Sequence, residues 1–226
     1  MTQNNKRIAK NTMFLYFRML VIMAVSFYTV RVVLDTLGVT DFGLYNLVAS
    51  FVMIMAVLNN TLTGGTQRFL TFEIGKNDIV KLKQTFSTAL IIHISLAFLI
   101  LILGETIGLW FLYEKMNIPV DRFDAAFWVY QFAIASIMVT IIQVPYDALI
   151  MAHERMHIFA YISIVEAILK LLVVYLLLVI SFDKLITYGI LMFLVSLSIA
   201  MFYRIYVLKN YDESHFSLSF DKDIVK

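Results

Sequence analysis

Residues 161–180, YISIVEAILKLLVVYLLLVI, decide the structural class of this protein. The stretch has the ~20 predominantly apolar residues that a helix needs to cross a hydrocarbon core ~30 Å thick. Only Glu166 and Lys170 interrupt it. Their four-residue spacing places the two opposite charges on one helical face, with the carboxylate nearer the N-terminus, the order that favours pairing. The sequence therefore predicts a membrane-spanning helix with a charged pair at the depth where ions are least tolerated.

The composition of the whole chain agrees with a membrane protein. Of its 226 residues, 61% are hydrophobic and 15% are charged, and the mean hydropathy is +0.85. Soluble domains average about 45–50% apolar residues, which excludes an ordinary soluble domain. The net charge of +2 gives no reason to expect nucleic acid as a partner. The absence of cysteine excludes disulfides and thiolate chemistry.

Six apolar runs are long enough to cross the membrane. Open segments in lipid satisfy their backbone only as helices, so the runs predict an all-α polytopic membrane protein. The spans are expected at residues 11–34, 42–72, 85–113, 123–150, 156–182 and 185–207. Residues 1–207 would form a six-helix transmembrane lobe, and residues 208–226 would begin a cytoplasmic connector.

Lysine and arginine predict the orientation of these spans, because both residues are enriched in cytoplasmic loops. With the N-terminus inside, twelve of the 18 basic residues lie on the cytoplasmic side and four lie outside. The remaining two, Arg18 and Lys170, lie within spans. Both termini are therefore predicted to be cytoplasmic.

Polar residues inside the spans are the candidate cavity residues. Arg18 would lie ~10–12 Å from the inner end of its span at 1.5 Å per residue, where it could line a cavity or extend to the headgroups. Glu166 and Lys170 could be a packed ion pair or a charged site in a water-filled cavity. Polar stripes on the second and fourth spans could equally serve helix packing. The candidate set is Arg18, Asn46, Asn60, Gln67, Gln143, Asp147, Glu166 and Lys170.

Other local signals concern helix ends and contacts. Asp41 and Asp183 precede the second and sixth spans and can cap those helices. Gly104 and Gly108 form a GxxxG pattern, which indicates close helix packing near the outer surface.

One motif is typical of an enzyme. Residues 153–157, HERMH, match H-E-x-x-H, in which His153 and His157 on one helical face would hold zinc and Glu154 would act as base. A third protein ligand is missing, and the stretch falls where the loop between the fourth and fifth spans belongs. We therefore predict no enzyme and no cofactor, and we keep a membrane zinc protease as an alternative.

Several stretches together resemble one family. They are KRIAKNTMFLYFRML, RVVLDTLGVTDFGLYNLVASF, TQRFLTFEIGKND, ETIGLWFL, NIPVDRFDAAFWVYQF, VPYDALIMAHERM and FAYISIVEAILKLL. In this order they resemble bacterial polysaccharide-biosynthesis membrane proteins, the Wzx-like flippases of the multidrug/oligosaccharidyl-lipid/polysaccharide (MOP, MATE-like) exporter superfamily. The resemblance runs from about residue 6 to the end of the chain.

The resemblance implies one lobe of a two-lobed transporter, so this chain would be its N-terminal half and would need a second six-helix lobe. Such proteins carry polyprenyl-pyrophosphate-linked oligosaccharides, precursors of surface polysaccharides such as the O-antigen of lipopolysaccharide. They move them across the bacterial inner membrane by alternating access, often coupled to an ion such as a proton or sodium. The expected partners are therefore the lipid-linked oligosaccharide, membrane lipids and a coupling ion.

The resemblance also frames the roles of the candidate residues. Drug-exporting relatives often keep an acidic residue in the first helix, where this chain has Arg18. This departure favours an anionic cargo, and a cation-coupled multidrug exporter of the same superfamily is the alternative. In this hypothesis Arg18 and Lys170 line the cavity, and Glu166 neutralises Lys170 when cargo is absent. Amides such as Asn60 and Gln143 would contact sugar hydroxyls.

Overall fold

The long elements of the structure are all helices. The computed structural model describes residues 3–215, and it describes the side chains of residues 12–50 and 62–215. The helices are α1 (Gln3–Lys76), α2 (Ile79–Leu103), α3 (Leu109–Glu114), α4 (Phe123–Ala152), α5 (Met156–Val179) and α6 (Lys184–Asn210). A π-helical turn (Gly104–Gly108) joins α2 to α3, and short 3-10 turns cover Val120–Arg122 and Asp212–Ser214. The predicted all-α class is confirmed.

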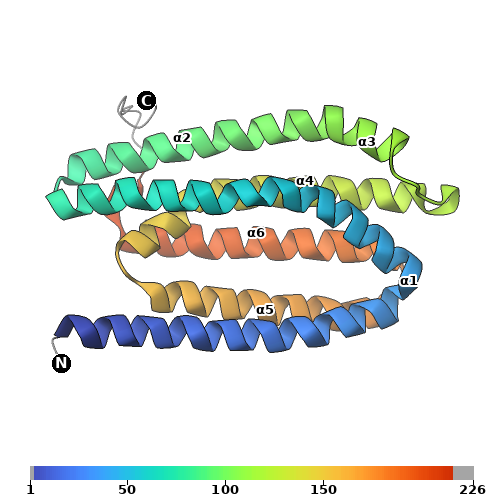
Figure 1. Ribbon diagram of the computed structural model, residues 1–226, viewed down its shortest axis with the longest axis horizontal. Coiled ribbons are helices and arrows are strands. Elements are labelled where there is room, and N and C mark those ends of the chain that lie inside the picture. Colours follow the sequence, from blue (N-terminus) through green and yellow to red (C-terminus); the bar gives the residue numbers. More distant parts are fainter. Residues whose placement is uncertain (1–2, 216–226) are drawn as a thin grey trace.

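Gly38 divides α1 into two limbs. Its φ of 76° and ψ of 169° are not helical, and the positive φ is one that glycine adopts without a steric penalty. The first limb ends at this bend, and the second limb runs back along the bundle (Figure 1). The bend lies inside the break that the sequence placed between residues 34 and 42. With two limbs in α1, the described residues form the predicted six-helix bundle.

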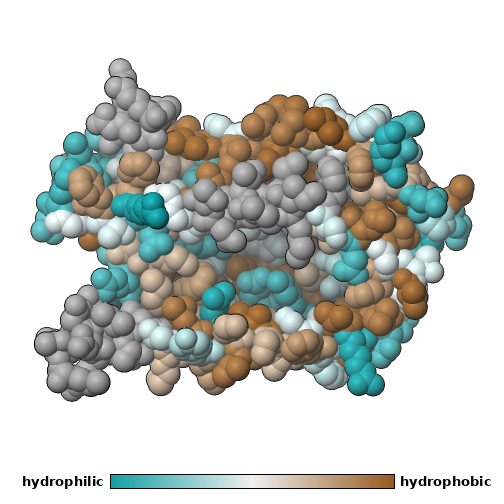
Figure 2. Space-filling view, viewed as in Figure 1, coloured by the Kyte–Doolittle hydropathy of each residue, from teal (hydrophilic) through white to brown (hydrophobic). Residues whose placement is uncertain are grey.

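The two limbs of α1 and the other long helices form two groups. The second limb of α1 packs with α2, α4 and α6, and α4 contacts each of the other three. The first limb packs along α5, at the bottom of Figure 1. A hollow that contains hydrophilic residues lies between this helix pair and the helices above it (Figure 2). The architecture thus leaves an open, partly polar space beside α5.

The outer surface of the bundle is apolar. Five stretches of the described chain are long and apolar enough to cross a membrane, and the first, Thr12–Ser50, includes the bend at Gly38. Large apolar side chains such as Phe27 and Trp128 are exposed on these helices. Exposed apolar area on this scale is suited to lipid and not to water. The chain is therefore a multi-pass membrane protein, as predicted.

The π-helical turn begins at Gly104, which packs closely against α4. The Tyr130 hydroxyl on α4 donates to the Gly104 carbonyl oxygen at 2.8 Å, which draws that carbonyl toward α4. A Cβ at Gly104 would lie well inside van der Waals contact of Ile134 Cδ1. The GxxxG prediction of close packing is confirmed at this position. The helical run from α2 through α3 begins at Ile79, six residues before the start that the sequence predicted for the third span.

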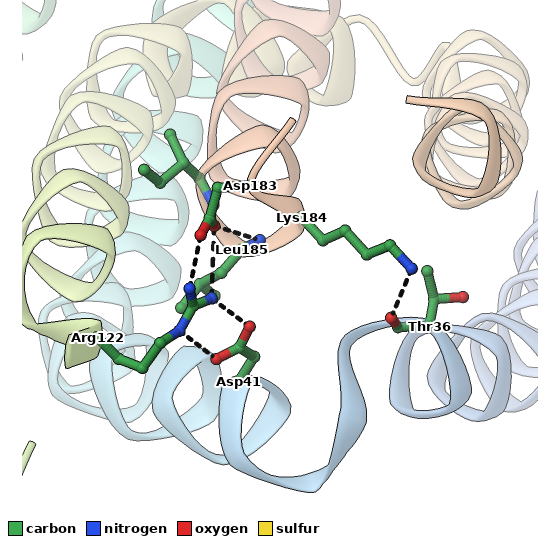
Figure 3. A network of polar contacts seen from close by, with 7 residues as sticks. Thr36, Asp41, Arg122, Asp183, Lys184 and Leu185 are labelled. Atoms are coloured by element: carbon green, nitrogen blue, oxygen red, sulfur yellow. Dashed lines mark hydrogen bonds and ion pairs between the residues drawn. The ribbon is translucent and has the colours of Figure 1, made fainter. Parts of the chain in front are cut away.

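The Gly38 end of the bundle is held by an ionic cluster (Figure 3). Arg122, just before α4, donates from Nε to Asp41 Oδ1 at 2.8 Å and from Nη1 to Asp183 Oδ2 at 2.6 Å. Asp183 also accepts from the backbone N–H groups of Leu185 and Ile186, which confirms it as the cap of α6. Asp41, predicted as a cap, has its carboxylate engaged by Arg122.

The cluster also determines the protonation of Asp183. Partial burial alone raises the pKa of this carboxyl group, but the contacts with Arg122 and the helix N–H groups outweigh burial and hold the pKa below its ordinary value. Lys184 extends the cluster across the bend, since its Nζ donates to the Thr36 carbonyl oxygen at 3.3 Å. The two limbs of α1, α4 and α6 are therefore tied together at one end.

Candidate functional site

A cavity of about 270 Å³ lies between the first limb of α1 and α5. Arg18, Glu166 and Lys170 are its charged lining residues among the part of the chain that the structure describes. The full lining is Arg18, Ile22, Val25, Ser26, Thr29, Val30, Ser163, Glu166, Ala167 and Lys170. We call this the basic cavity, because it contains two cationic side chains and one carboxylate.

The three charges in the basic cavity are not fully paired. Lys170 Nζ lies 2.6 Å from Glu166 Oε1, and the two side chains are 40% and 37% exposed, so the pair faces open space and is not packed away. The Arg18 guanidinium lies 4.4 Å above the ring centre of Phe159, a cation–π contact. Arg18 Nε and Thr29 Oγ1 are buried and have no hydrogen-bond partner. Buried polar atoms normally have partners, so this lining is suited to a polar ligand.

A second polar group adjoins the basic cavity. Gln143 Nε2 on α4 donates to both carboxylate oxygens of Asp147, each at 3.1 Å. Tyr203 on α6 lies beside the buried Ser163 and within electrostatic range of Arg18, Asp147 and Glu166. Residues from α1, α4, α5 and α6 therefore converge on one region. Gln143 and Asp147 do not line the basic cavity, and Asp147 lies within electrostatic range of Glu166, which does.

Lys170 also lines a second cavity, of about 210 Å³, whose other lining residues come from the second limb of α1, α4 and α6. We call this the hydroxyl cavity, because Ser136, Thr140 and Ser196 contribute hydroxyl groups to its lining. Its full lining is Tyr45, Val48, Ala49, Val129, Phe132, Ala133, Ser136, Ile137, Thr140, Lys170, Gly189, Met192 and Ser196. The two cavities thus share one lysine side chain.

The candidates on the second limb of α1 lie elsewhere. Asn46 is exposed, and its Nδ2 donates to the Phe42 carbonyl oxygen of its own helix at 2.8 Å. Gln67 is half-buried and lines neither cavity. The side chain of Asn60 lies outside the described residues. Arg18, Glu166 and Lys170 are the candidates that the structure brings together in one lining.

The H-E-x-x-H stretch does not lie on a helix. The helix α4 ends at Ala152 and α5 begins at Met156, and Glu154 adopts a positive φ of 57° in the turn between them. His153 Nε2 contacts Glu213 Oε1 at 2.7 Å, and its ring stacks on Tyr211. The expectation that His153 and His157 share a helical face is wrong, because the turn separates them. No group of three or more potential metal ligands occurs among the described side chains.

The turn instead anchors the chain after α6. The contacts of His153 with Glu213 and Tyr211 hold the segment after α6 against the α4–α5 turn. Within that segment Ser214 is buried, and its hydroxyl donates to the Tyr211 carbonyl oxygen at 2.6 Å. The helix α6 extends to Asn210, beyond the predicted end at residue 207. Most of the predicted connector, residues 216–226, lies outside the described residues.

No protein-family model matches the sequence, and no curated protein matches it significantly. The architecture does match solved structures. An outward-facing multidrug resistance MATE family transporter of the MOP superfamily superimposes with a TM-score of 0.79 at 15% identity, covering 96% of this chain and 49% of that one. The chain has the fold of one lobe of a MATE transporter.

Two further structures share this MATE-type lobe over the same fractions of both chains. One is a MOP superfamily transporter from Pyrococcus furiosus, described as having a binding pocket of reverse polarity that suggests a different function, with a TM-score of 0.72 and 14% identity. The other is a MATE protein in complex with MaL6, with a TM-score of 0.64 and 16% identity. This chain therefore spans about half the length of the solved MATE-type structures that it matches.

Sequence reasoning missed several residues of the two linings. Ser26 and Thr29 follow Arg18 by eight and eleven residues, so at ~100° per residue both lie within ~80° of it on the helix, and this periodicity could have indicated them. Tyr45 and Ser196 reach the hydroxyl cavity from helices far apart in the sequence. No local pattern indicates that Lys170 faces two cavities.

Proposed function

We propose that this chain is one lobe of a membrane transporter that moves an anionic, lipid-linked glycan, of the polyprenyl-pyrophosphate-linked oligosaccharide class, across the bilayer. The observation that carries the proposal is the basic cavity, where Arg18 and Lys170 share one lining with a single carboxylate. A bare pyrophosphate cannot cross hydrocarbon, because an unpaired ion there costs tens of kcal/mol by idealised Born estimates. Two cationic side chains facing open space lower that cost.

The charged residues of the basic cavity would have different roles in binding the anion. Arg18 has an unpartnered Nε and would donate to a pyrophosphate oxygen while its guanidinium stays on the Phe159 ring. Lys170 is paired with Glu166 at 2.6 Å, so an arriving anion would compete with that carboxylate for the ammonium group. Glu166 thereby keeps Lys170 neutralised when the cavity is empty. Charge-assisted bonds of this kind are the stronger ones in proteins.

The proposal includes a second lobe and a defined orientation. The MATE-type structures that match are about twice as long, so a second six-helix lobe would close the open side of the basic cavity and permit alternating access. The start of α1 and the end of α6 lie at the same end of the bundle (Figure 1), as an even number of crossings requires. We place this end in the cytoplasm, with the lobe in the bacterial inner membrane, because of the lysine and arginine distribution.

A second candidate function is a cation-coupled multidrug exporter. The observation in its favour is the pair of carboxylates, Asp147 and Glu166, near the cavities, since a carboxylate could bind a coupling proton or sodium ion, or a cationic drug. One of the matching structures is a multidrug resistance transporter. The two functions predict opposite charge preferences for the cargo.

Equilibrium binding to the purified chain in lipid nanodiscs tests the proposal. The probe is a polyprenyl pyrophosphate without sugars. Lys170→Met removes a charge-assisted bond worth ~1.5–3 kcal/mol, and should weaken binding by about tenfold or more. Glu166→Gln removes the competing carboxylate and should bind as tightly as the wild type or more tightly. Lys115→Met is the matched control, because Lys115 is exposed outside both cavities and should leave binding unchanged.

The double variant Glu166→Gln with Lys170→Met separates a binding role from a structural one. It removes both charges without leaving either unpaired, and an ion pair, even a buried one, can often be replaced in this way without loss of folding. If Lys170 binds the anion, the double variant should bind as weakly as Lys170→Met. Binding at the wild-type level by the double variant would return the pair to a structural role and refute the proposal for Lys170.

A further inference from the structure

The hydroxyl cavity has a lining whose hydrogen-bonding character is fixed by its own helices. Ser136 donates its hydroxyl proton to the Phe132 carbonyl oxygen at 2.8 Å, and Thr140 donates to the Ser136 carbonyl oxygen at 2.8 Å. Ser196 on α6 donates to the Met192 carbonyl oxygen at 3.2 Å. A hydroxyl that has donated its proton retains its lone pairs as acceptors. These three hydroxyls therefore present acceptors, and an occupant that bonds to them must supply hydrogen-bond donors.

The remaining lining restricts the occupant further. Tyr45 and Phe132 contribute aromatic surface, and Tyr45 is held edge-on to Tyr188 with ring centres 4.7 Å apart. Lys170 is the one charged residue among the described residues that line this cavity, and no carboxylate accompanies it there. Glu166 Oε1 lies 2.6 Å from Lys170 Nζ and neutralises this lysine, but Glu166 does not line the cavity. The lining therefore offers a cationic occupant no carboxylate of its own and favours a neutral group with many hydroxyls.

The size of the cavity fits one ring. A protein cavity of about 150 Å³ holds a benzene molecule, so 210 Å³ has room for a single six-membered ring with its substituents. The apolar face of such a ring can pack on an aromatic side chain while its hydroxyls reach the acceptors. A pyranose combines a six-membered ring, donor hydroxyls and an apolar face.

We infer that the hydroxyl cavity is the subsite for the sugar nearest to the anionic group, and that Lys170 bridges the sugar subsite and the pyrophosphate subsite. This inference rests on the proposed function, because the basic cavity must bind the anion. Lys170 lines both cavities, so one ammonium group can contact the phosphate while the attached ring enters the hydroxyl cavity. Arg18 lines only the basic cavity and would contact the anion alone.

The test compares two probes on the purified chain in nanodiscs: a polyprenyl pyrophosphate without sugar, and the same lipid carrying one N-acetylglucosamine. The wild type should bind the sugar-bearing lipid more tightly. Ser196→Ala and Thr140→Val should each reduce that preference by roughly two- to twelvefold, the value of one hydrogen bond, and leave the affinity for the bare lipid unchanged. Ser198→Ala is the matched control, since its hydroxyl also donates to its own helix, at 2.7 Å, but lies outside the cavity.

Each outcome decides the inference. If the bare lipid binds but the sugar adds no affinity to the wild type, the sugar subsite is refuted and the proposed function stands. The sugar subsite is also refuted if Ser196→Ala and Thr140→Val both keep the same preference for the sugar-bearing lipid as the control Ser198→Ala. If neither lipid binds, the inference falls together with the proposed function. Ala49→Met, which places a larger side chain in the cavity lining, should abolish the sugar preference and retain binding of the bare lipid.

Discussion

Removing Arg122 should destabilise the lobe by about 2–4 kcal/mol. The guanidinium makes hydrogen bonds to two carboxylates, Asp41 and Asp183, and its loss would leave these two negative charges facing each other. Breaking a buried ion pair costs ~3–5 kcal/mol, and exposed pairs contribute ~0–1 kcal/mol. The three side chains are 16–32% exposed, so the cost of Arg122→Met should lie between the costs for exposed and buried pairs. It should be nearer the buried value, because two carboxylates lose their partner.

The comparison variants show whether charge or geometry dominates. Arg122→Lys keeps the charge but not the fork that reaches both carboxylates, so it should recover only part of the loss. The triple variant with Asp41→Asn, Arg122→Met and Asp183→Asn should be more stable than Arg122→Met, because it leaves no carboxylate unpaired. Arg31→Met is the control, an equivalent change at an exposed arginine, and should cost less than about 0.5 kcal/mol.

Unfolding in mixed micelles with increasing SDS, followed by tryptophan fluorescence, measures these differences. The free energy of unfolding should fall in the order wild type, Arg122→Lys, Arg122→Met. An Arg122→Met variant within 0.5 kcal/mol of the wild type would contradict the idea that the cluster holds the Gly38 end together. A triple variant no more stable than Arg122→Met would contradict the argument from unpaired carboxylates.

Three further predictions follow from helix packing, protonation and topology. Gly104→Ala should lower the free energy of unfolding by about 1–3 kcal/mol in the same SDS assay, because the added methyl group overpacks against Ile134. Helix propensity alone would favour alanine, so a gain in stability would refute this packing. Burial raises the Asp183 pKa, but Arg122 and the helix N–H groups outweigh burial and lower it, so the stability that this group contributes should be lost as the pH falls below about 4. Asp183→Asn should weaken this loss of stability at low pH. An unchanged midpoint of acid unfolding in this variant would contradict the lowered pKa of Asp183. Cysteine at Lys115 should react with an impermeant reagent from outside and cysteine at Asn77 only from the cytoplasm, and the reverse pattern would overturn the predicted orientation.

Much of the fold could be predicted because it depends on local properties of the sequence. Apolar runs indicated the helices, and the pattern at Gly104 indicated close packing. The Asp183 cap follows from a side chain placed directly before a helix. The ionic cluster could not be predicted, because Arg122 lies 81 residues from Asp41 and 61 residues from Asp183. The expectation that His153 and His157 share one helical face was wrong for a local reason, since a turn interrupts the helix between them.

The candidate site could be predicted in part, because its charged residues lie deep within predicted membrane spans. Arg18, Glu166 and Lys170 are conspicuous because charge is costly inside a membrane, and that cost depends on each residue's own position in its span. Asn46 and Gln67 carried a weaker signal, since polar side chains on membrane helices often satisfy their own backbone, as Asn46 does. That Lys170 borders two cavities depends on how α5 packs against α1, α4 and α6, which no single stretch of sequence specifies.

The most direct test of the central claim, that the basic cavity selects an anion, is the ratio of two affinities. The purified chain in nanodiscs is offered two lipids with the same prenyl chain, one ending in pyrophosphate and the other in a quaternary ammonium group. With Arg18 and Lys170 against one carboxylate, the pyrophosphate should bind at least about tenfold more tightly, and this preference should decline with salt because ionic attraction is screened. Equal binding, or tighter binding of the ammonium lipid, would contradict an anionic cargo and favour the multidrug alternative.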